Sequence, residues 1–525
     1  MALWAAGVRV LTRHLGIQPE SSAVLLGEII GSWLVLNALL LGLKTWYRRR
    51  YSPFRDIPGP EPGPWLYGHA FDIFDEPLGR RITDWGNAQA YPHGLMHFFG
   101  LFGVSYLVPT SPAALAEVLS TRAYDYVKPA GFKRFTRRFW GHGIVSQEQE
   151  EHRLHRKTYQ AVFNQGNIAQ ARGPLSTKSR QLVDRIHGLC APSPSHSAIV
   201  PVTQLTARVS LDVTGLIALG VDFETILDRN PQVLEAHEAL FAGSRDKRTL
   251  FALYNAAPRW LGGLIPLRVA RRMDEASRVL RGACRQAIRS RAAVKANGQR
   301  LDFVAHLVQQ GLYDEEAAIS QIMVILGAGY ESTGGTLAWI LYCLATHPDS
   351  QAALRQEVRS RSRPMDESDY EALPLLNAVV LEATRLYPAF SFLLRKTIRA
   401  TAISGRAIPR GTYVALCPHM VNHARHLWGP DVEAFRPERW VDRSSPAGPK
   451  LDATGGASAA VCMLSFFSGA RSCVGRALAL ALMKRQVALL VDHFQLDPVG
   501  GTPQASGLFA TSPPADLHVR FTQVR

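Results

Sequence analysis

The stretch FFSGARSCVG, residues 466–475, constrains this chain more than any other ten residues. It places Cys473 directly before residues 474–491, VGRALALALMKRQVALLV, which are apolar on nearly every helical face and are therefore predicted to form a buried helix. Cys473 then lies at or just before the helix N-terminus, where unpaired backbone N–H groups and the helix dipole stabilise a thiolate. The plain alternative is a turn that leads into a buried helix and carries a structural cysteine.

The other residues of this stretch favour a ligand-binding loop. Gly469 and Gly475 permit tight turns and a close approach of the backbone to a planar ligand, and Arg471 can reach a carboxylate. A structural cysteine requires none of these features. A thiolate that ligates haem iron requires all of them, with the arginine on a haem propionate.

A second informative segment is residues 23–43, in which Glu28 is the only ionic side chain. As a helix it would extend about 31 Å at about 1.5 Å per residue, enough to span a bilayer. Basic residues are concentrated after it, between positions 44 and 55, whereas only Arg9 and Arg13 precede it, so the downstream side is predicted to face the cytosol. A cleaved signal peptide and a buried core helix are weaker alternatives, because no small-residue cleavage site follows and the flank is strongly basic.

The chain divides around this segment. Residues 1–22 are predicted to be a lumenal or interfacial segment; residues 1–19 carry two arginines and no acid, so a mitochondrial presequence is the alternative. Residues 44–69 are predicted to be a basic flank and a proline-rich hinge, a semi-rigid spacer whose five prolines exclude helix. Residues 70–525 are predicted to form one globular domain, mainly α with minor β, because long apolar-periodic stretches dominate.

Composition narrows the function classes. The chain has 59 Lys and Arg against 43 Asp and Glu, a net charge of +16, which suits docking to an acidic partner or an anionic membrane face. Nucleic acid is not expected as a partner, because the basic residues are dispersed and no nucleic-acid motif accompanies them. The six cysteines are far apart in sequence, which indicates neither a disulfide framework nor a thiolate zinc site and favours a reducing compartment.

One long helix is predicted from Asp314 to His347, with acids at its start and Pro348 after its end. Its centre reads GAGYEST, residues 327–333, and two glycines within a helix cost roughly 1 kcal/mol each against alanine. They would let a flat ligand lie against the backbone, while Glu331, Ser332 and Thr333 supply an acid and hydroxyls that relay protons and locally open the helix. A close helix crossing with a solvated glutamate is an equally good explanation.

A second helix is bracketed by Pro374 and Pro388 and carries Glu382 and Arg385 on one face. Such a pair is usually an ion pair at the surface, worth under about 1 kcal/mol. It would form a buried network only if a third charge joined it, and Arg439 in the turn FRPERW, residues 435–440, is the candidate.

The histidines in HMVNHARH, residues 419–426, have the spacing of a one-faced metal site. However, Met420 stands where the glutamate of HExxH would follow, and nearby prolines and Gly429 indicate a loop. A zinc hydrolase is therefore not favoured.

Taken together, these motifs resemble those of the cytochrome P-450 superfamily, in the family's order and over residues from about 55 to the end. The loop with Phe466, Gly469, Arg471, Cys473 and Gly475 matches the haem-binding motif FxxGxRxCxG, and Ala328 to Thr333 is similar to the oxygen-activation motif. Glu382 and Arg385 are similar to the ExxR pair, and FRPERW to the turn that joins it. His152 with Arg156, and Arg395, resemble elements that contact the haem propionates, with histidine where tryptophan is common. The family's usual threonine is Ser332 here, followed by Thr333, so which hydroxyl touches dioxygen stays open.

The resemblance implies the fold, the cofactor and the partners. It implies a cytochrome P-450 fold with haem b, whose iron is ligated by Cys473, and a monooxygenase that uses O2 to hydroxylate, epoxidise or further oxidise a lipophilic small molecule. No GxGxxG fingerprint is present, so electrons from NADPH are expected from NADPH-cytochrome P-450 reductase, with cytochrome b5 as a further donor. The expected location is the endoplasmic reticulum membrane, in contact with lipid through a single span, with the catalytic domain in the cytosol.

The resemblance also maps a substrate pocket. The positions that correspond to it are apolar or uncharged, which favours a terpenoid, polyketide or steroid-like compound over a fatty acid that needs a carboxylate clamp. The sequence AGYEST and the proline-rich spacer are similar to fungal microsomal members that modify secondary metabolites. A haem-thiolate isomerase or dehydratase that needs no reductase, and a membrane haem protein without turnover, are the alternatives. The predicted pocket residues are Val324, Ala328, Ala389, Phe390, Phe392, Leu393, Phe509 and Thr511.

Overall fold

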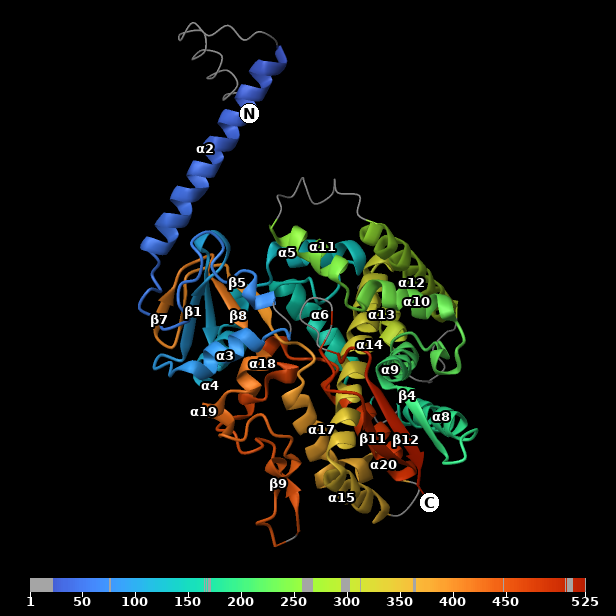
Figure 1. Cartoon of the computed structure of the whole chain (residues 1–525). Coiled ribbons are helices and arrows are strands. Elements are labelled where there is room, and N and C mark those ends of the chain that lie inside the picture. The colour runs from blue at the N-terminus through green and yellow to red at the C-terminus, as the bar shows by residue number, and fades with distance from the viewer. Residues whose placement is uncertain are drawn as a thin grey trace, which may run out of the picture.

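The computed structural model describes residues 22–524 except 75–76, 165, 167, 169–170, 257–267, 294–302, 312, 362–364, 447, 506 and 508–512. The described part is mostly helical with small sheets, which confirms the predicted fold class (Figure 1). Two predicted pocket residues, Phe509 and Thr511, and the predicted N-terminal segment up to residue 21 lie outside the described residues.

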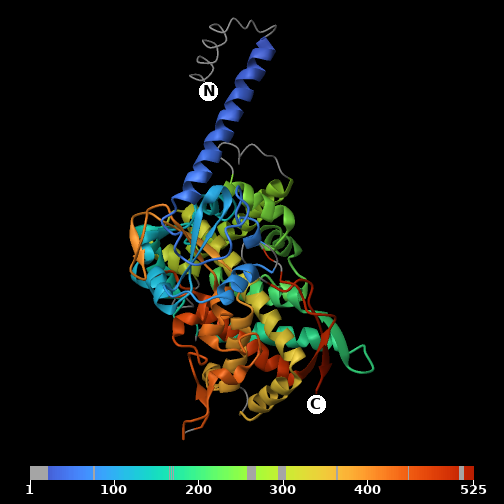
Figure 2. The same ribbon diagram turned by 60° about the vertical axis from the view of Figure 1, so that its left-hand side comes forward.

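The N-terminal helix α2, Ser22–Arg50, projects away from the rest of the chain (Figures 1 and 2). It contains the whole predicted span 23–43 and continues as helix through the basic flank. Its part from Gly27 to Arg50 is long and apolar enough to cross a membrane, and little of it is buried by the remainder of the protein.

The proline-rich segment after α2 packs on the globular part. Phe54 and Ile57 are buried in a hydrophobic core cluster. The Arg49 guanidinium, at the end of α2, donates hydrogen bonds to the four successive carbonyls of residues 62–65 at 2.5–3.1 Å. The segment predicted to be a spacer is therefore fixed to both the helix and the domain.

A five-stranded sheet follows, in the order β1-β2-β8-β5-β3, with only β2 and β8 parallel among its pairs. Its β1 strand, LMHFF, is buried along its full length, as expected for a nearly continuous apolar run. A second sheet, β11-β12-β4, joins the C-terminus to the middle of the chain. The strands are β1 Leu95–Phe99, β2 Ser105–Pro109, β3 Tyr126–Val127, β4 Ser197–Pro201, β5 Leu393–Thr397, β6 Thr401–Ile403, β7 Arg406–Ile408, β8 Tyr413–Leu416, β9 Val441–Asp442, β10 Lys450–Leu451, β11 Phe494–Val499 and β12 His518–Gln523.

Helix α14, Glu315–Thr346, runs through the centre of the molecule (Figure 1). The side chain of Asp314 caps it by accepting a hydrogen bond from the Ala317 N–H, so the predicted long helix and its acidic start are confirmed. The other helices are α3 Arg80–Ala88, α4 Pro112–Ala116, α5 Ala130–Phe139, α6 Gln149–Val162, α8 Arg172–Cys190, α9 Val202–Ala218, α10 Pro231–Phe241, α11 Arg245–Ala256, α12 Arg268–Ala293, α13 Phe303–Gln310, α15 Pro348–Arg359, α16 Glu367–Glu371, α17 Pro374–Leu386, α18 Pro418–Asn422, α19 Arg425–Trp428 and α20 Arg476–His493.

The glycines in the middle of α14 serve helix packing. A Cβ atom on Gly327 would collide with the Phe241 ring at the end of α10, and one on Gly329 would collide with Thr214 of α9. Of the two explanations left open by the sequence, these glycines support close helix crossings rather than contact with a flat ligand. The helix also stays continuous through this region, so the expected local opening is wrong.

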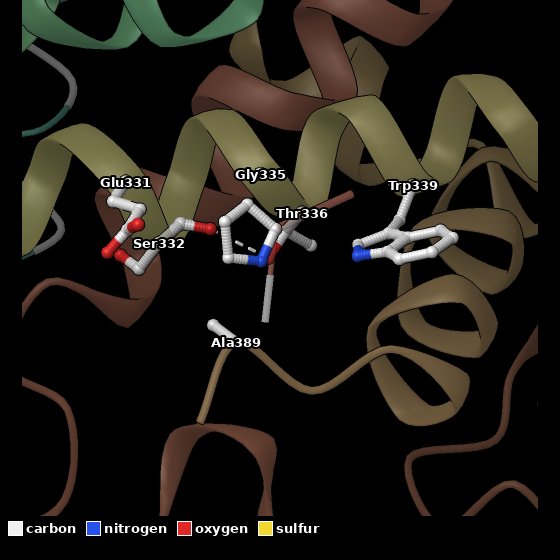
Figure 3. Close-up of a pocket in the computed structure, with 7 residues that line it drawn as sticks. Glu331, Ser332, Gly335, Thr336, Trp339 and Ala389 are labelled. Atoms are coloured by element: carbon white, nitrogen blue, oxygen red, sulfur yellow. Dashed lines mark hydrogen bonds between the residues drawn. The ribbon is translucent and has the colours of Figure 1, made fainter. Parts of the chain in front are cut away.

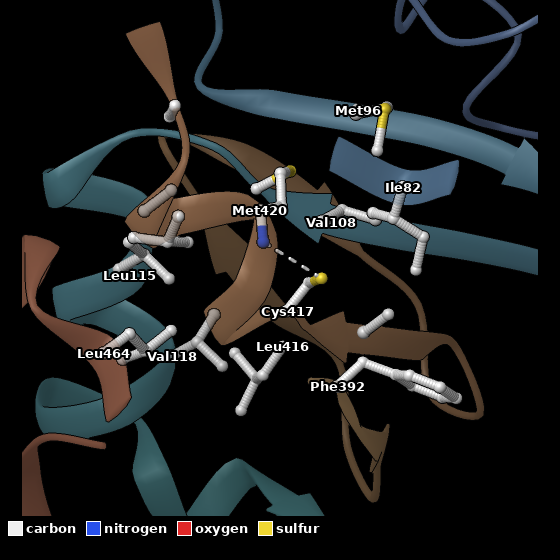
Figure 4. Packing of buried hydrophobic residues seen from close by; sticks show 14 of the residues in the cluster. Ile82, Met96, Val108, Leu115, Val118, Phe392, Leu416, Cys417, Met420 and Leu464 are labelled. Carbon is white, nitrogen blue, oxygen red and sulfur yellow. Dashed lines mark hydrogen bonds between the residues drawn. The ribbon is translucent and has the colours of Figure 1, made fainter. Parts of the chain in front are cut away.

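One hydrophobic core cluster lies between the five-stranded sheet and α3, α4 and α18 (Figure 4). It includes Phe392, which is 5% exposed. The sequence placed Phe392 in the substrate pocket. It is buried among core side chains, and its place in the pocket stays a prediction.

Candidate functional site

The loop of residues 466–473, which precedes α20, is closed by a hydrogen bond within its own backbone. The N–H of Cys473 donates to the Phe466 carbonyl at 2.8 Å. Gly469 has a φ of 69°, and a Cβ atom there would collide with the Leu119 carbonyl, so this position requires glycine. Gly475 directly precedes α20 and has open space where a Cβ atom would lie, which leaves room for a ligand beside the backbone.

The Cys473 side chain is accessible although it lies deep within the protein, so it lines an interior space. Burial raises the pKa of its thiol, whereas backbone N–H groups of Gly475 and Arg476 and the charge of Arg156 lower it. Ala328 is likewise accessible in the middle of the otherwise buried helix α14, and α14 packs against α20. An accessible thiol at a helix N-terminus is the arrangement expected of a thiolate ligand.

Four cations gather beside this loop. The pKa of His152 is lowered to about 3, first by burial and then by the charges of Arg471, Lys128, Arg156 and Arg395. His152 is therefore neutral at physiological pH, and its Nδ1 lies 3.1 Å from the Tyr124 hydroxyl. The structure thus brings together the predicted propionate residues from α6, β5 and the cysteine loop.

These cations have unused donors. Nε and Nη1 of Arg471 and Nε of Arg156 are buried and have no hydrogen-bond partner among the described residues. Buried guanidinium donors are costly unless an anion pairs with them. Together with the accessible thiol and the open side of Gly475, they fit a haem, with its propionates at the arginines and its iron at Cys473.

Two charged residues of this cluster, Lys128 and Glu148, were not predicted from the sequence. Glu148 accepts a hydrogen bond from Arg471 at 2.7 Å and another from the Lys128 backbone N–H at 2.7 Å. Neither residue stands in a recognisable motif, so only the folded structure reveals them.

A second group of predicted residues, Glu331 and Ser332 of α14, lines a narrow pocket. Figure 3 shows their side chains on the same side of α14 as Thr336 and Trp339, with Ala389 opposite. The Ser332 hydroxyl also donates to the Ala328 carbonyl at 2.5 Å. Thr333 is buried and does not line the pocket.

The other predicted pocket residues separate into two groups. Ala389 lines this pocket. Ala328 is accessible and lies on α14, the helix that carries Glu331 and Ser332. Val324 is buried in a core cluster, whereas Phe390 and Leu393 are partly buried and pack against the core shown in Figure 4. Gly335, Thr336, Trp339 and Pro513 complete the pocket lining and were not predicted. The first three follow Ser332 at helical spacing, so periodicity alone could have found them.

Glu382 and Arg385 form the buried network for which the sequence required a third charge. Both side chains are fully buried, and Arg385 donates two hydrogen bonds of 2.9 Å to the Glu382 carboxylate. Arg439 Nε and Trp440 Nε1 donate to the same carboxylate at 2.9 Å each. Burial alone would raise the pKa of Glu382, but Arg385, Arg439 and Trp440 together lower it. The network ties α17 to the turn 437–440.

The three histidines of residues 419–426 hydrogen bond to protein atoms. His419 Nδ1 lies 2.7 Å from the Thr83 hydroxyl, His423 Nδ1 lies 2.8 Å from the His419 carbonyl, and His426 Nε2 lies 3.0 Å from a main-chain carbonyl, that of Thr110. The predicted loop is wrong, because the segment forms the short helices α18 and α19. Among the described residues, no group of three or more potential metal ligands occurs.

Comparisons with known proteins agree with this geometry. The family model of cytochrome P-450 matches residues 58–516. The chain is 31% identical to cytochrome P-450 monooxygenase sphH of Aspergillus fumigatus over 92% of this chain and 89% of that protein. It is 30% identical to cytochrome P-450 monooxygenase ptmK of Penicillium ochrochloron over 93% and 97% of the two chains, and 29% identical to cytochrome P-450 monooxygenase buaD of Petromyces alliaceus over 85% and 82%.

Proposed function

This chain belongs to the cytochrome P-450 family, and from that premise we propose that it is a membrane-anchored monooxygenase that oxidises a lipophilic secondary metabolite, such as a terpenoid or polyketide. The observation that carries the proposal is the accessible Cys473 thiol at the N-terminus of α20, beside buried arginine donors that lack partners among the described residues. The fungal relatives are named as cytochrome P-450 monooxygenases, which supports the reaction class, and the mostly uncharged pocket residues support the substrate class.

Haem b would be held by Cys473 at its iron, with Arg156, Arg395, Arg471 and His152 at its propionates. When bound, the haem supplies the oxygen-activating chemistry that amino-acid side chains lack. Phe466 would support the ligand loop, because its ring packs against a core cluster. The centre of this ring lies 5.8 Å from the Arg476 guanidinium carbon.

On the pocket side, Glu331 and Ser332 hold and transfer protons to the reacting oxygen. The Ser332 hydroxyl faces the pocket and can accept a proton from one partner while donating to another. The Glu331 side chain, one residue away, takes up a proton from solvent as a carboxylate and passes it to Ser332 as a carboxylic acid. Among the described residues that line the pocket, only Glu331 is ionisable, which suits an apolar substrate.

Helix α2 is the basis for the proposed location of the protein and for its proposed electron donors. We infer that α2 anchors the chain in the endoplasmic reticulum membrane, with its basic end and the catalytic domain in the cytosol. NADPH-cytochrome P-450 reductase would supply electrons there, with cytochrome b5 as a further donor. The net charge of +16 suits docking to an acidic redox partner.

The test begins with the spectrum of the reduced protein treated with carbon monoxide. We expect the red-shifted band of a thiolate ligand in the wild type, its loss in Cys473→Ser, and its retention in Cys462→Ser, which removes a buried cysteine near the loop. A wild-type protein without the band, or a Cys473→Ser protein that keeps it, would refute the thiolate assignment.

The second step tests turnover. Membranes that contain the protein and the reductase are incubated with a library of lipophilic compounds, with and without NADPH. Oxygenated products that require NADPH support the monooxygenase. Products formed equally without NADPH indicate the isomerase or dehydratase alternative, and a stable haem spectrum with no product from any compound indicates a non-catalytic haem protein.

A further inference from the structure

Glu148 is an acidic residue inside a cluster of cations. It immediately precedes α6, at the position where a side chain usually caps a helix, yet its carboxylate makes no capping hydrogen bond. One oxygen, Oε2, instead lies 2.7 Å from Nη2 of Arg471, which is two residues before Cys473. The side chains are only 12% and 8% exposed, so solvent screens this ion pair weakly.

The other oxygen of Glu148 is fixed from a third segment. Oε1 accepts the Lys128 backbone N–H at 2.7 Å and lies 3.6 Å from the Lys128 ammonium, which also donates to the Gln147 carbonyl. A single carboxylate therefore joins the residues after β3, the start of α6 and the cysteine loop. Because both oxygens of the Glu148 carboxylate accept hydrogen bonds, the side chain has little freedom to move.

The hydrogen bond from Arg471 to Glu148 also orients the Arg471 guanidinium. Glu148 uses Nη2 of the guanidinium, while Nε and Nη1 remain buried with no hydrogen-bond partner among the described residues. The Arg471 guanidinium also lies 5.2 Å from the centre of the Tyr124 ring. Because Glu148 binds Nη2 and the Tyr124 ring lies against one face, the guanidinium presents Nε and Nη1 in a fixed direction, as a second carboxylate would require.

The charges of the cluster show why an acid belongs there. Four cations, Lys128, Arg156, Arg395 and Arg471, surround His152, and Glu148 pairs with two of them. Burial lowers the pKa of Lys128 well below its usual range, so the three arginines carry the charge that Glu148 offsets only in part. A haem would add negative charge there through its two propionates.

We propose that Glu148 is a positioning residue for the haem, which orients Arg471 toward a propionate and offsets part of the positive charge of the site, thereby lowering the reduction potential of the iron. The proposal rests on the proposed function, since it requires that haem binds at Cys473. A negative charge near the iron opposes the uptake of an electron, and charged neighbours beyond the direct ligands are known to tune metal sites.

The test compares Glu148→Gln with Glu150→Gln, both measured as holoproteins. Glu150 lies two residues further along α6 and is 80% exposed, so its loss removes the same charge without changing the cluster. For Glu148→Gln we expect a positive shift of the midpoint potential by 59 mV or more, a tenfold change in the one-electron equilibrium. We also expect several-fold faster transfer of haem to apomyoglobin. Glu150→Gln should match the wild type in both measurements.

The variant Glu148→Asp separates the effect of the charge from that of the side-chain length. It also keeps the test decisive if Glu148→Gln does not accumulate. The charge is retained, so the potential should stay at the wild-type value. The shorter side chain lengthens the contact with Arg471, so haem transfer should accelerate; an unchanged transfer rate would contradict the positioning role. A Glu148→Gln potential equal to that of Glu150→Gln would overturn the electrostatic role. A wild type without the thiolate band would instead refute the proposed function.

Discussion

At the scale of single residues, Ser332 and Thr333 are adjacent hydroxyls with different surroundings. Ser332 lines the pocket and donates to the Ala328 carbonyl, whereas Thr333 is buried and is not part of the pocket lining. We therefore expect Ser332→Ala to reduce product formed per NADPH consumed by about tenfold or more, because the pocket loses its proton-transferring hydroxyl. Thr333→Val serves as the matched control and should leave this ratio within about twofold of the wild type.

The measurement is the yield of oxygenated product and hydrogen peroxide per NADPH in reductase-containing membranes. Ser332→Ala should divert electrons to peroxide. If Thr333→Val diverts them and Ser332→Ala does not, then the assignment of the hydroxyl on α14 must be reversed.

His97 allows a pH prediction at the same scale. It is buried in β1 between Phe54 and Phe99, its Nε2 has no hydrogen-bond partner among the described residues, and burial lowers its pKa to about 4. The unfolded chain binds a proton at this residue below about pH 6.5, whereas the folded chain does so only near pH 4. Stability contributed by neutral His97 is therefore complete above about pH 6.5 and is lost as the pH falls toward 4.

The substitution His97→Phe removes the group that binds this proton in the unfolded chain. We expect the free energy of unfolding to depend less steeply on pH between about 6.5 and 4, by up to about 1.4 kcal/mol per pH unit, the value for a single proton. Urea titrations at several pH values measure the slope. The control, His93→Phe, changes an exposed histidine nearby and should leave it unchanged; equal slopes for both variants would show that His97 does not contribute.

At the scale of elements, the Glu382 network fixes α17 against the turn 437–440. Removal of one partner from a buried ion pair leaves the other charge uncompensated, at a cost of about 3–5 kcal/mol. Glu382→Ala should lower the free energy of unfolding by that amount, because Arg385 and Arg439 lose their shared carboxylate. Chemical denaturation of the holoprotein, followed by circular dichroism, gives the difference.

The control for this element is Asp84→Ala, which breaks the ion pair between Asp84 and Arg80 on the surface of α3. The two side chains are 50% and 54% exposed, so the loss of this pair should cost no more than about 1 kcal/mol. If both variants lose the same small amount, then the buried network contributes no more than a surface pair. If Glu382→Ala yields no folded protein, Glu382→Gln, which keeps the side-chain shape, provides the intermediate measurement.

The elements also show what a sequence can and cannot predict here. The long helix α14, the cysteine at the start of α20 and the Glu382–Arg385 pair were predicted because each depends on local periodicity or a spacing of a few residues. Glu148 was not, because its partner Arg471 is 323 residues away and only the fold brings them together. The packing of Phe392 in the core cluster could not be predicted either, because the side of the sheet that a residue faces next to β5 depends on strand pairing, not on composition.

At the scale of the whole molecule, the last turns of helix α2 contact the rest of the chain. Arg48 donates to the Phe102 carbonyl at 3.2 Å, and Arg49 holds the carbonyls of residues 62–65 and lies 5.1 Å from the Phe99 ring. The last turns of α2 therefore belong physically to the domain, whereas the apolar part before them does not.

Two truncations separate these roles. A chain that begins at Lys44 should leave the membrane fraction, because the apolar span is gone, and should keep the thermal midpoint of the full chain, because Arg48 and Arg49 remain. A chain that begins at Ser52 should also leave the membrane but lose about 1–2 kcal/mol of stability, the value of the hydrogen bonds to exposed charged groups that it lacks. Sedimentation of cell membranes and thermal unfolding monitored by the haem absorbance measure both. Continued membrane binding of the chain from Lys44 would show that α2 is not the anchor, and equal thermal midpoints for the two truncations would show that the arginine contacts do not stabilise the domain.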